Sequence, residues 1–112
     1  MFQILEYEIG HGSVVVIDDK LKTQYKGITG MFVWTEDYND LRRVSLEIKI
    51  DSKEVLPIGF PAEVFSSNPF RNLEDCILKL DFPALSKIEG KITNIGNKEK
   101  PITIKIIFFI KL

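Results

Sequence analysis

The residues best able to do chemistry lie around the single histidine of the chain. His11 stands in a Gly-His-Gly sequence and is followed by Ser13, and two aspartates, Asp18 and Asp19, come soon after. Serine, histidine and aspartate can form a catalytic triad, but only where the fold brings the three side chains within hydrogen-bond reach of one another. Nothing in this spacing requires that arrangement, and the chain has no Gly-x-Ser-x-Gly nucleophile motif. We therefore interpret His11 as a solvated turn residue, and we expect no catalytic residue and no enzyme activity.

Metal and cofactor sites are equally hard to build from these residues. One histidine cannot supply the several imidazole ligands that a metal-dependent cupin barrel uses. The Gly-His-Gly-Ser sequence lacks the third glycine of a dinucleotide-binding loop. An acidic segment offers oxygen atoms to calcium, but its spacing differs from the Asp-x-Asp-x-Asp-Gly calcium loop, so we interpret it as a solvated loop. We predict no metal-binding and no cofactor-binding residue. The polar residues of the acidic segment are Glu36, Asp37, Asn39 and Asp40.

The composition indicates one domain, residues 1–112. The chain is 45% hydrophobic and 28% charged, with 15 Lys and Arg against 16 Asp and Glu. This length fits a single domain, and the balanced charge argues against a nucleic-acid partner. No basic residue precedes Lys20, and the longest purely apolar run, Ile106–Ile110, has five residues. A secretory signal needs a positive start, and a membrane helix needs about 20 apolar residues, so we expect neither.

Apolar and polar residues alternate with period two along most of the chain, which predicts β-strands. In Val44–Ile50 the apolar residues face one way and Ser, Glu and Lys the other, as in a half-buried antiparallel strand. The longest expected loop is 66–75, and a turn is expected at Asn94–Asn97. The other strands are expected around Leu5, Tyr7 and Ile9 and at Val14–Ile17, 28–36, Lys53–Ile58, Ala62–Phe65, 76–82, Lys87–Thr93 and Ile102–Lys111.

These segments make eight or nine short strands and no convincing helix. Such a pattern predicts an all-β, single-domain antiparallel β-sandwich of jelly-roll or Greek-key type with about eight strands. Gly90 interrupts one strand and indicates a bulge or a close backbone approach. Cys76 alternates in phase with Leu78 and Leu80, so we interpret it as a buried small hydrophobe.

The sandwich has more apolar side chains than its inner faces need. In Ile102–Lys111 the even-numbered face is wholly apolar and is expected in the core, whereas Ile107 and Phe109 lie on the other face beside lysines. Either a loop of the same chain or a second subunit must cover them. The segment 28–36 is also apolar on both faces. The candidate interface residues are therefore Met31, Val33, Ile107 and Phe109.

Aromatic residues are the remaining functional signal. Trp34, Tyr38 and Phe70 lie in or next to expected loops and are candidate exposed aromatics. Exposed aromatic rings can stack on sugars or anchor a protein interface, and core packing is the alternative for each of them.

Four segments of the chain carry a resemblance to known proteins: Lys26–Val33, Val44–Phe65, Lys87–Asn97 and Ile102–Lys111. These segments resemble small single jelly-roll virion proteins (capsid, penton or capsid-associated) of phages that infect Bacteroidetes-type bacteria. This resemblance implies an assembly role in the virion, with copies of the chain and other capsid proteins as partners, and it assigns no functional residue. We therefore predict a non-enzymatic capsid building block. The alternative is a carbohydrate-binding or adhesion sandwich, with a glycan as partner and a cytoplasmic location.

Overall fold

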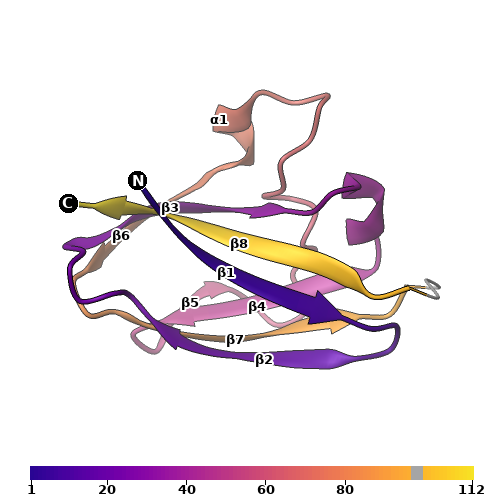
Figure 1. The fold of residues 1–112 in the computed structure, drawn as a ribbon, viewed down its shortest axis with the longest axis horizontal. Coiled ribbons are helices and arrows are strands. Elements are labelled where there is room, and N and C mark those ends of the chain that lie inside the picture. Colours follow the sequence, from indigo (N-terminus) through magenta and orange to yellow (C-terminus); the bar gives the residue numbers. More distant parts are fainter. Residues whose placement is uncertain (97–99) are drawn as a thin grey trace.

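The computed structural model describes residues 1–96 and 100–112. Within these ranges the chain forms eight strands and two single-turn helices, and the strands make two four-stranded sheets packed as two layers (Figure 1). The elements are β1 (Phe2–Ile9), β2 (Val14–Lys20), β3 (Gly27–Trp34), the 3-10 helix η1 (Tyr38–Leu41), β4 (Val44–Ile50), β5 (Lys53–Leu56), α1 (Leu73–Cys76), β6 (Leu78–Pro83), β7 (Lys87–Asn94) and β8 (Ile102–Lys111).

The strand order identifies the sandwich as a jelly roll. One sheet, which we call the β8 sheet, has the order β1-β8-β3-β6, and the other, the β7 sheet, has the order β2-β7-β4-β5. All pairs are antiparallel, and the first strand pairs with the last, the second with the seventh, the third with the sixth and the fourth with the fifth. This is the pairing of one long hairpin rolled into two packed sheets. The predicted all-β antiparallel sandwich of jelly-roll type is confirmed.

The core lies between the two sheets and follows the period-two alternation of the strands. The apolar residues of β4 are at most 2% exposed, and β8 buries its even-numbered residues from Ile102 to Ile110. Phe108 in β8 is the largest of the fully buried side chains. Alternation places one row of each strand inward because successive side chains of a strand point to opposite faces. The inward-facing rows predicted for β4 and β8 are confirmed.

Gly90 lies in β7 between its two paired neighbours in the β7 sheet, β2 and β4. It is in register with Ile17 of β2 on one side and Ile48 of β4 on the other. A Cβ atom at this position would overlap the backbone carbonyl oxygen of Glu47 in β4. Only glycine fits here, so the predicted close approach is confirmed.

A buried amide joins the two sheets where their edge strands β1 and β2 meet. Gln3 in β1 is 5% exposed. Its Nε2 donates a hydrogen bond to the carbonyl oxygen of Lys20 at 2.9 Å, and its Oε1 accepts one from the backbone N–H of Lys22 at 2.9 Å. These two backbone groups follow β2 at its end, where strand pairing stops. The side chain of Gln3 therefore takes the place of a strand neighbour at this edge.

The predicted edge strand at Ala62–Phe65 is wrong. The backbone N–H of Val64 donates to the carbonyl oxygen of Pro61 at 3.3 Å, so the chain turns here instead of extending. Only isolated bridges flank the turn, one from Pro61 to Ser45 and one from Ser66 to Val33. Proline has no backbone N–H to donate to a strand ladder, which limits pairing in this segment.

Other boundaries differ by a few residues. β5 ends at Leu56 because Pro57 follows, and β2 continues to Lys20. Cys76 ends helix α1 and does not belong to a strand, but it is buried as predicted. The predicted turn at Asn94–Asn97 ends outside the described residues.

Candidate functional site

The structure does not bring the triad-type residues together. His11 and Ser13 are exposed in the turn between β1 and β2, and Asp18 and Asp19 lie toward the far end of β2. Four or five strand residues separate the turn from these aspartates, which is about 15 Å of extended chain. His11 therefore lies in a turn, and the aspartates are too distant to orient it.

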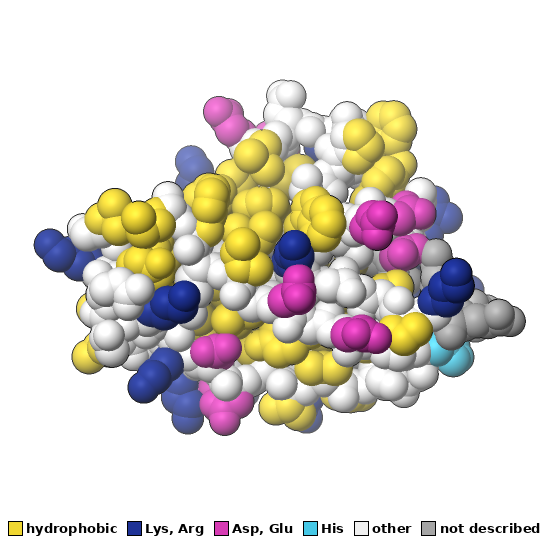
Figure 2. All heavy atoms as spheres, in the orientation of Figure 1, with side chains coloured by type: hydrophobic (Ala, Val, Ile, Leu, Met, Phe, Trp, Pro, Cys, Tyr) yellow, Lys and Arg dark blue, Asp and Glu magenta, His cyan; other side chains and the backbone are white. Residues whose placement is uncertain are grey.

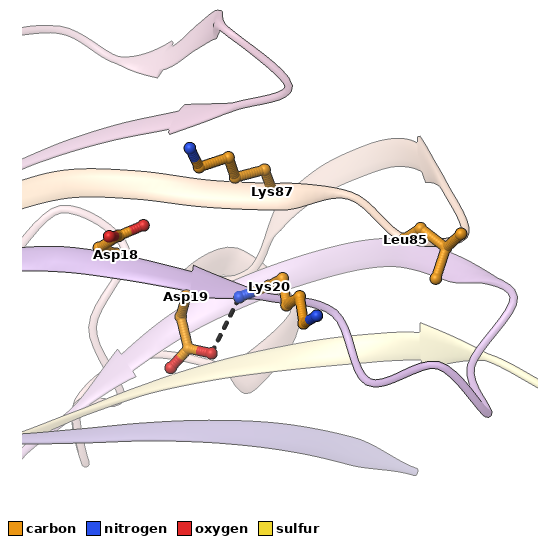
Figure 3. Close-up of a pocket in the computed structure, with 5 residues that line it drawn as sticks. All are labelled: Asp18, Asp19, Lys20, Leu85 and Lys87. Atoms are coloured by element: carbon orange, nitrogen blue, oxygen red, sulfur yellow. Dashed lines mark hydrogen bonds between the residues drawn. The ribbon is translucent and has the colours of Figure 1, made fainter.

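A surface hollow lies beside those aspartates, between the end of β2 and the turn before β7. It has a volume of about 470 Å³ and is lined by Asp18, Asp19, Lys20, Leu85 and Lys87. Figure 3 shows that the two ammonium groups point away from each other and that Asp19 turns toward its own backbone, where it accepts a hydrogen bond from the N–H of Lys20 at 2.9 Å. The polar groups do not converge on a point that a ligand could occupy.

The carboxylate of Asp37, in the acidic segment after β3, accepts hydrogen bonds from a residue of the same segment. The side chain of Asp37 caps η1 and accepts hydrogen bonds from the backbone N–H of Asn39 at 3.0 Å and from its Nδ2 at 3.2 Å. This is the usual role of an aspartate at a helix start. In residues 1–96 and 100–112 no group of three or more His, Cys, Asp and Glu side chains is arranged to hold a metal ion.

The ionisation of Tyr7 in β1 makes the stability of the fold depend on pH in the alkaline range. Burial raises the pKa of its phenol, and the negative charge of Asp19 raises it further. In the unfolded chain the Tyr7 phenol loses its proton near pH 10. The stability that the protonated phenol gives the fold is therefore complete below that pH, and it is lost as the pH rises through the higher pKa of the folded state.

We therefore expect Tyr7→Phe to reduce the loss of stability above about pH 10. Urea unfolding followed from about pH 8 to about pH 11 measures this loss, with Tyr25→Phe as the matched control. The same alkaline decline in Tyr7→Phe and in the unmodified protein would contradict the assignment.

The structure divides the candidate interface residues into two pairs. Met31 and Val33 are 0% and 1% exposed and belong to the core, which corrects their prediction as interface residues. They lie on the side of β3 that packs in the core between the two sheets, and the outward-facing side chain between them is Phe32. Ile107 and Phe109 are half-buried on the outer side of β8, as the alternation predicted.

Ile107 and Phe109 belong to a continuous apolar surface across three strands. Phe2 pairs with Phe109 and Ile4 with Ile107 in the β1–β8 ladder, and Phe32 lies opposite Ile107 in β3. The ring of Phe109 lies 5.0 Å from that of Phe2 and 5.7 Å from that of Phe32. Figure 2 shows hydrophobic side chains gathered over β1 and β8. We call these five residues the outer apolar face.

Exposure of the outer apolar face rises steadily from β3 to β1. Phe32 is 8% exposed, whereas Phe2 and Ile4 are 50% and 51% exposed. A loop of the same chain lies over the β3 side, since Ile77 is the side chain nearest to Gly30 on that face. The loop therefore covers one side of the outer apolar face, and the β1 side stays open.

The outer face of the β7 sheet is charged over its two central strands, with Glu47 and Lys49 on β4 and Glu89 and Lys91 on β7. The ammonium of Lys49 lies 3.9 Å from a carboxylate oxygen of Glu47. An isolated sandwich normally presents such polar side chains to water. The edge strand β2 departs from this pattern, because its outward-facing Val14 and Val16 are 55% and 65% exposed. The outer apolar face differs from this face in that its apolar side chains are continuous across three strands.

The three candidate aromatics do not form a common platform for a sugar. Trp34 is half-buried, and the ammonium of Lys105 lies 4.9 Å from its ring centre, in reach of Glu6 at 3.6 Å. Tyr38 is half-buried and meets Phe70 edge to face at 5.9 Å. Of the three, only Phe70 is largely exposed, at 81%.

Sequence reasoning missed Phe2 and Ile4, which are the most exposed residues of the outer apolar face. Their odd-numbered neighbours Leu5 and Ile9 had marked the inner row of β1. The signal was present, because an apolar residue on the outer row of an edge strand departs from the usual alternation.

No family model, no curated protein and no solved structure matches this chain. The part of the chain that the structure describes contains no helix long and apolar enough to span a membrane.

Proposed function

We propose that this chain is a structural building block of a virus particle, a non-enzymatic jelly-roll capsid subunit that acts through contacts with copies of itself and with other capsid proteins. The observation that carries the proposal is the outer apolar face on a sheet of a jelly roll. Jelly rolls are recurrent in viral capsid proteins, and the sequence resemblance points to the same class.

Covering Phe2 and Ile4 removes apolar surface from water. Each is about half exposed. A large apolar side chain carries on the order of 200 Å² of surface, so the two together leave about 200 Å² in water. Removing that area from water contributes about 5 kcal/mol, which is comparable to the roughly 4–15 kcal/mol that association costs in lost translational and rotational freedom. A single contact is therefore weak, and association is strengthened when many copies assemble.

The opposite faces of the molecule also suit a subunit within a shell. In this proposal the charged central strands of the β7 sheet stay in water, while the outer apolar face is buried against a neighbour. A subunit with one solvated face and one buried apolar face has a defined orientation in an assembly.

We expect the protein to self-associate reversibly as its concentration rises, and Ile4→Glu to weaken this association at least tenfold, because a buried unpaired carboxylate is costly. Sedimentation velocity over a wide concentration range measures the effect. The matched control is Val16→Glu, which places the same charge at a 65% exposed valine on the β7 sheet and is expected to associate normally. Equal weakening by both substitutions would contradict a specific surface.

A second measurement tests whether the chain is a component of virus particles. Mass spectrometry of virus particles purified from the source of the sequence is expected to find the chain in many copies per particle. A protein that stays monomeric at high concentration and is missing from such particles would overturn the proposed function.

A further inference from the structure

A polar hollow lies between η1 and the segment 63–71, which Figure 1 shows leaving the body of the sandwich on its way to α1. The hollow has a volume of about 370 Å³, which is within the range of small-molecule sites. Most such sites are lined mainly by apolar side chains, whereas this one is lined mainly by hydrogen-bonding groups. We call it the η1 hollow, and its polar lining includes Tyr38, Asn39, Arg42, Glu63, Asn68 and Arg71.

The walls of the η1 hollow are fixed by hydrogen bonds. The backbone N–H of Ser67 donates to the carbonyl oxygen of Val33 in β3 at 2.8 Å, which holds the segment 63–71 against the sandwich. The guanidinium of Arg71 donates to the carbonyl oxygen of Val64 at 2.9 Å and to that of Asp75 at 2.7 Å. On the other side, η1 is held by its capping carboxylate. A site that is already ordered loses little entropy when a ligand binds.

Several polar groups of the η1 hollow have no partner among the residues that the structure describes. The guanidinium of Arg42 is one, and the Nδ2 group of Asn68 is another, since only the Oδ1 of Asn68 is bonded, to the N–H of Phe70 at 2.8 Å. The side-chain oxygen of Asn39 and the carboxylate of Glu63 are acceptors in the same position. The hollow therefore offers both donors and acceptors. A sugar hydroxyl uses both, because it donates one hydrogen bond and accepts others.

The charges around the η1 hollow favour a sugar over a simple ion. The guanidiniums of Arg42 and Arg71 repel a cation, and the carboxylate of Glu63 opposes a compact anion such as phosphate. Hydroxyl groups can bond to all three side chains without a net charge. A sugar that carries one carboxylate also fits, because a guanidinium can pair with it through two hydrogen bonds.

Two aromatic rings lie beside these polar groups. Tyr38 lines the hollow, and its ring meets that of Phe70 edge to face at 5.9 Å. Phe70 is 81% exposed, so most of its ring faces water. The face of an aromatic ring is negative, and the C–H groups of a sugar ring are slightly positive, so the two can stack. Trp34 lies outside this hollow, so the stacking surface comes from two of the three candidate aromatics.

We propose that the η1 hollow binds a sugar unit of a glycan, with Arg42, Asn68 and Glu63 on its hydroxyl groups and Phe70 stacked on its ring. These residues are distinct from those of the outer apolar face, so the inference goes beyond the proposed contact between subunits. One open hollow binds a sugar weakly, with a Kd of about 1 mM, and several copies in one particle bind a surface glycan more tightly.

Saturation-transfer NMR tests the proposal with the methyl glycosides of glucose, galactose, mannose and N-acetylglucosamine and with glucuronic acid. We expect magnetisation to pass from the protein to at least one of these sugars. Arg42→Gln and Phe70→Ser are each expected to weaken binding about tenfold. Arg43→Gln is the control for the first, since it changes the neighbouring exposed arginine outside the hollow. Ile58→Ser is the control for the second, since Ile58 is also 81% exposed.

Each outcome decides for or against the η1 hollow. Binding that both variants weaken and both controls keep supports the proposal, and a comparison of glucuronic acid with glucose then shows whether the guanidiniums prefer a carboxylate or hydroxyl groups. No transfer to any of the five sugars overturns the proposal. Binding that survives both Arg42→Gln and Phe70→Ser, or that the controls lose equally, also overturns it.

The same variants keep this inference separate from the proposed function. Self-association is expected to depend on Ile4 and to be unchanged by Arg42→Gln and Phe70→Ser. A protein that self-associates but binds no sugar overturns the sugar site and leaves the proposed function standing. Thermal melts that match the unmodified protein confirm that the variants fold, as expected for exposed sites.

Discussion

Replacing Gly90 with alanine is expected to destabilise the fold by about 3 kcal/mol, which is a large part of the stability of a domain this small. The added Cβ would overlap the backbone carbonyl oxygen of Glu47, and a backbone atom cannot rotate away as a side chain can. Either β7 must separate from β4, or the ladder that holds Gly90 opposite Ile48 must shift. Both changes disturb the centre of the β7 sheet.

Thermal unfolding measures this effect as a fall in Tm of about 15 °C for a domain of this size. Gly10→Ala is the matched control, since a Cβ there meets only the side-chain oxygen of Ser13 at 3.3 Å, which can move. The control is expected to stay within about 1 kcal/mol of the unmodified protein. A Gly90→Ala protein as stable as the Gly10→Ala protein would show that β7 and β4 are not this close in solution.

Replacing Gln3 with leucine is expected to have the second largest effect, also about 3 kcal/mol. Leucine keeps the volume of the side chain but leaves the carbonyl oxygen of Lys20 and the N–H of Lys22 without the partner they have now. A polar group that loses its partner on burial costs about 1–3 kcal/mol. Because Gln3 joins the two sheets, we also expect faster hydrogen exchange at the β1–β2 edge.

The other glutamine of the chain supplies the matched control. Gln24 is exposed, so Gln24→Leu is expected to change the free energy of unfolding by less than about 0.5 kcal/mol. Urea unfolding compares the two variants directly. Gln3→Glu separates the two hydrogen bonds, because a carboxylate can still accept from Lys22 but cannot donate to Lys20. Stability equal to that of the Gln24→Leu protein would show that water replaces the Gln3 amide.

Strands that alternate regularly could be predicted from the sequence. Val44–Ile50 and Ile102–Lys111 were predicted with the bounds that the structure has, because alternation along a strand directly reports which face is buried. Cys76 is buried as predicted, but the reason was wrong, because the prediction placed the residue in a strand and the structure places it at the end of helix α1. Local pattern is sufficient where a residue's environment depends on its own strand.

Features that depend on contacts between distant segments could not be predicted in this way. Met31 and Val33 were predicted as interface residues because both sides of β3 are apolar, and the packing of the two sheets decides which side faces the core. The hydrogen bonds of Gln3 span 17 and 19 residues of sequence, and no local pattern indicates them. The guanidinium of Arg71 donates hydrogen bonds to the carbonyl oxygens of Val64 and Asp75, and no local pattern indicates these contacts either.

The pairing of the first strand with the last also sets the order in which the molecule can fold. β8 lies between β1 and β3, so β1 has no neighbour in its sheet, and β3 has only β6, until the ribosome has made residues 102–111. Long-range pairing of this kind is slow, on the order of milliseconds to seconds. The β8 sheet can therefore be completed, and the core between the sheets closed, only after residues 102–111 have been added.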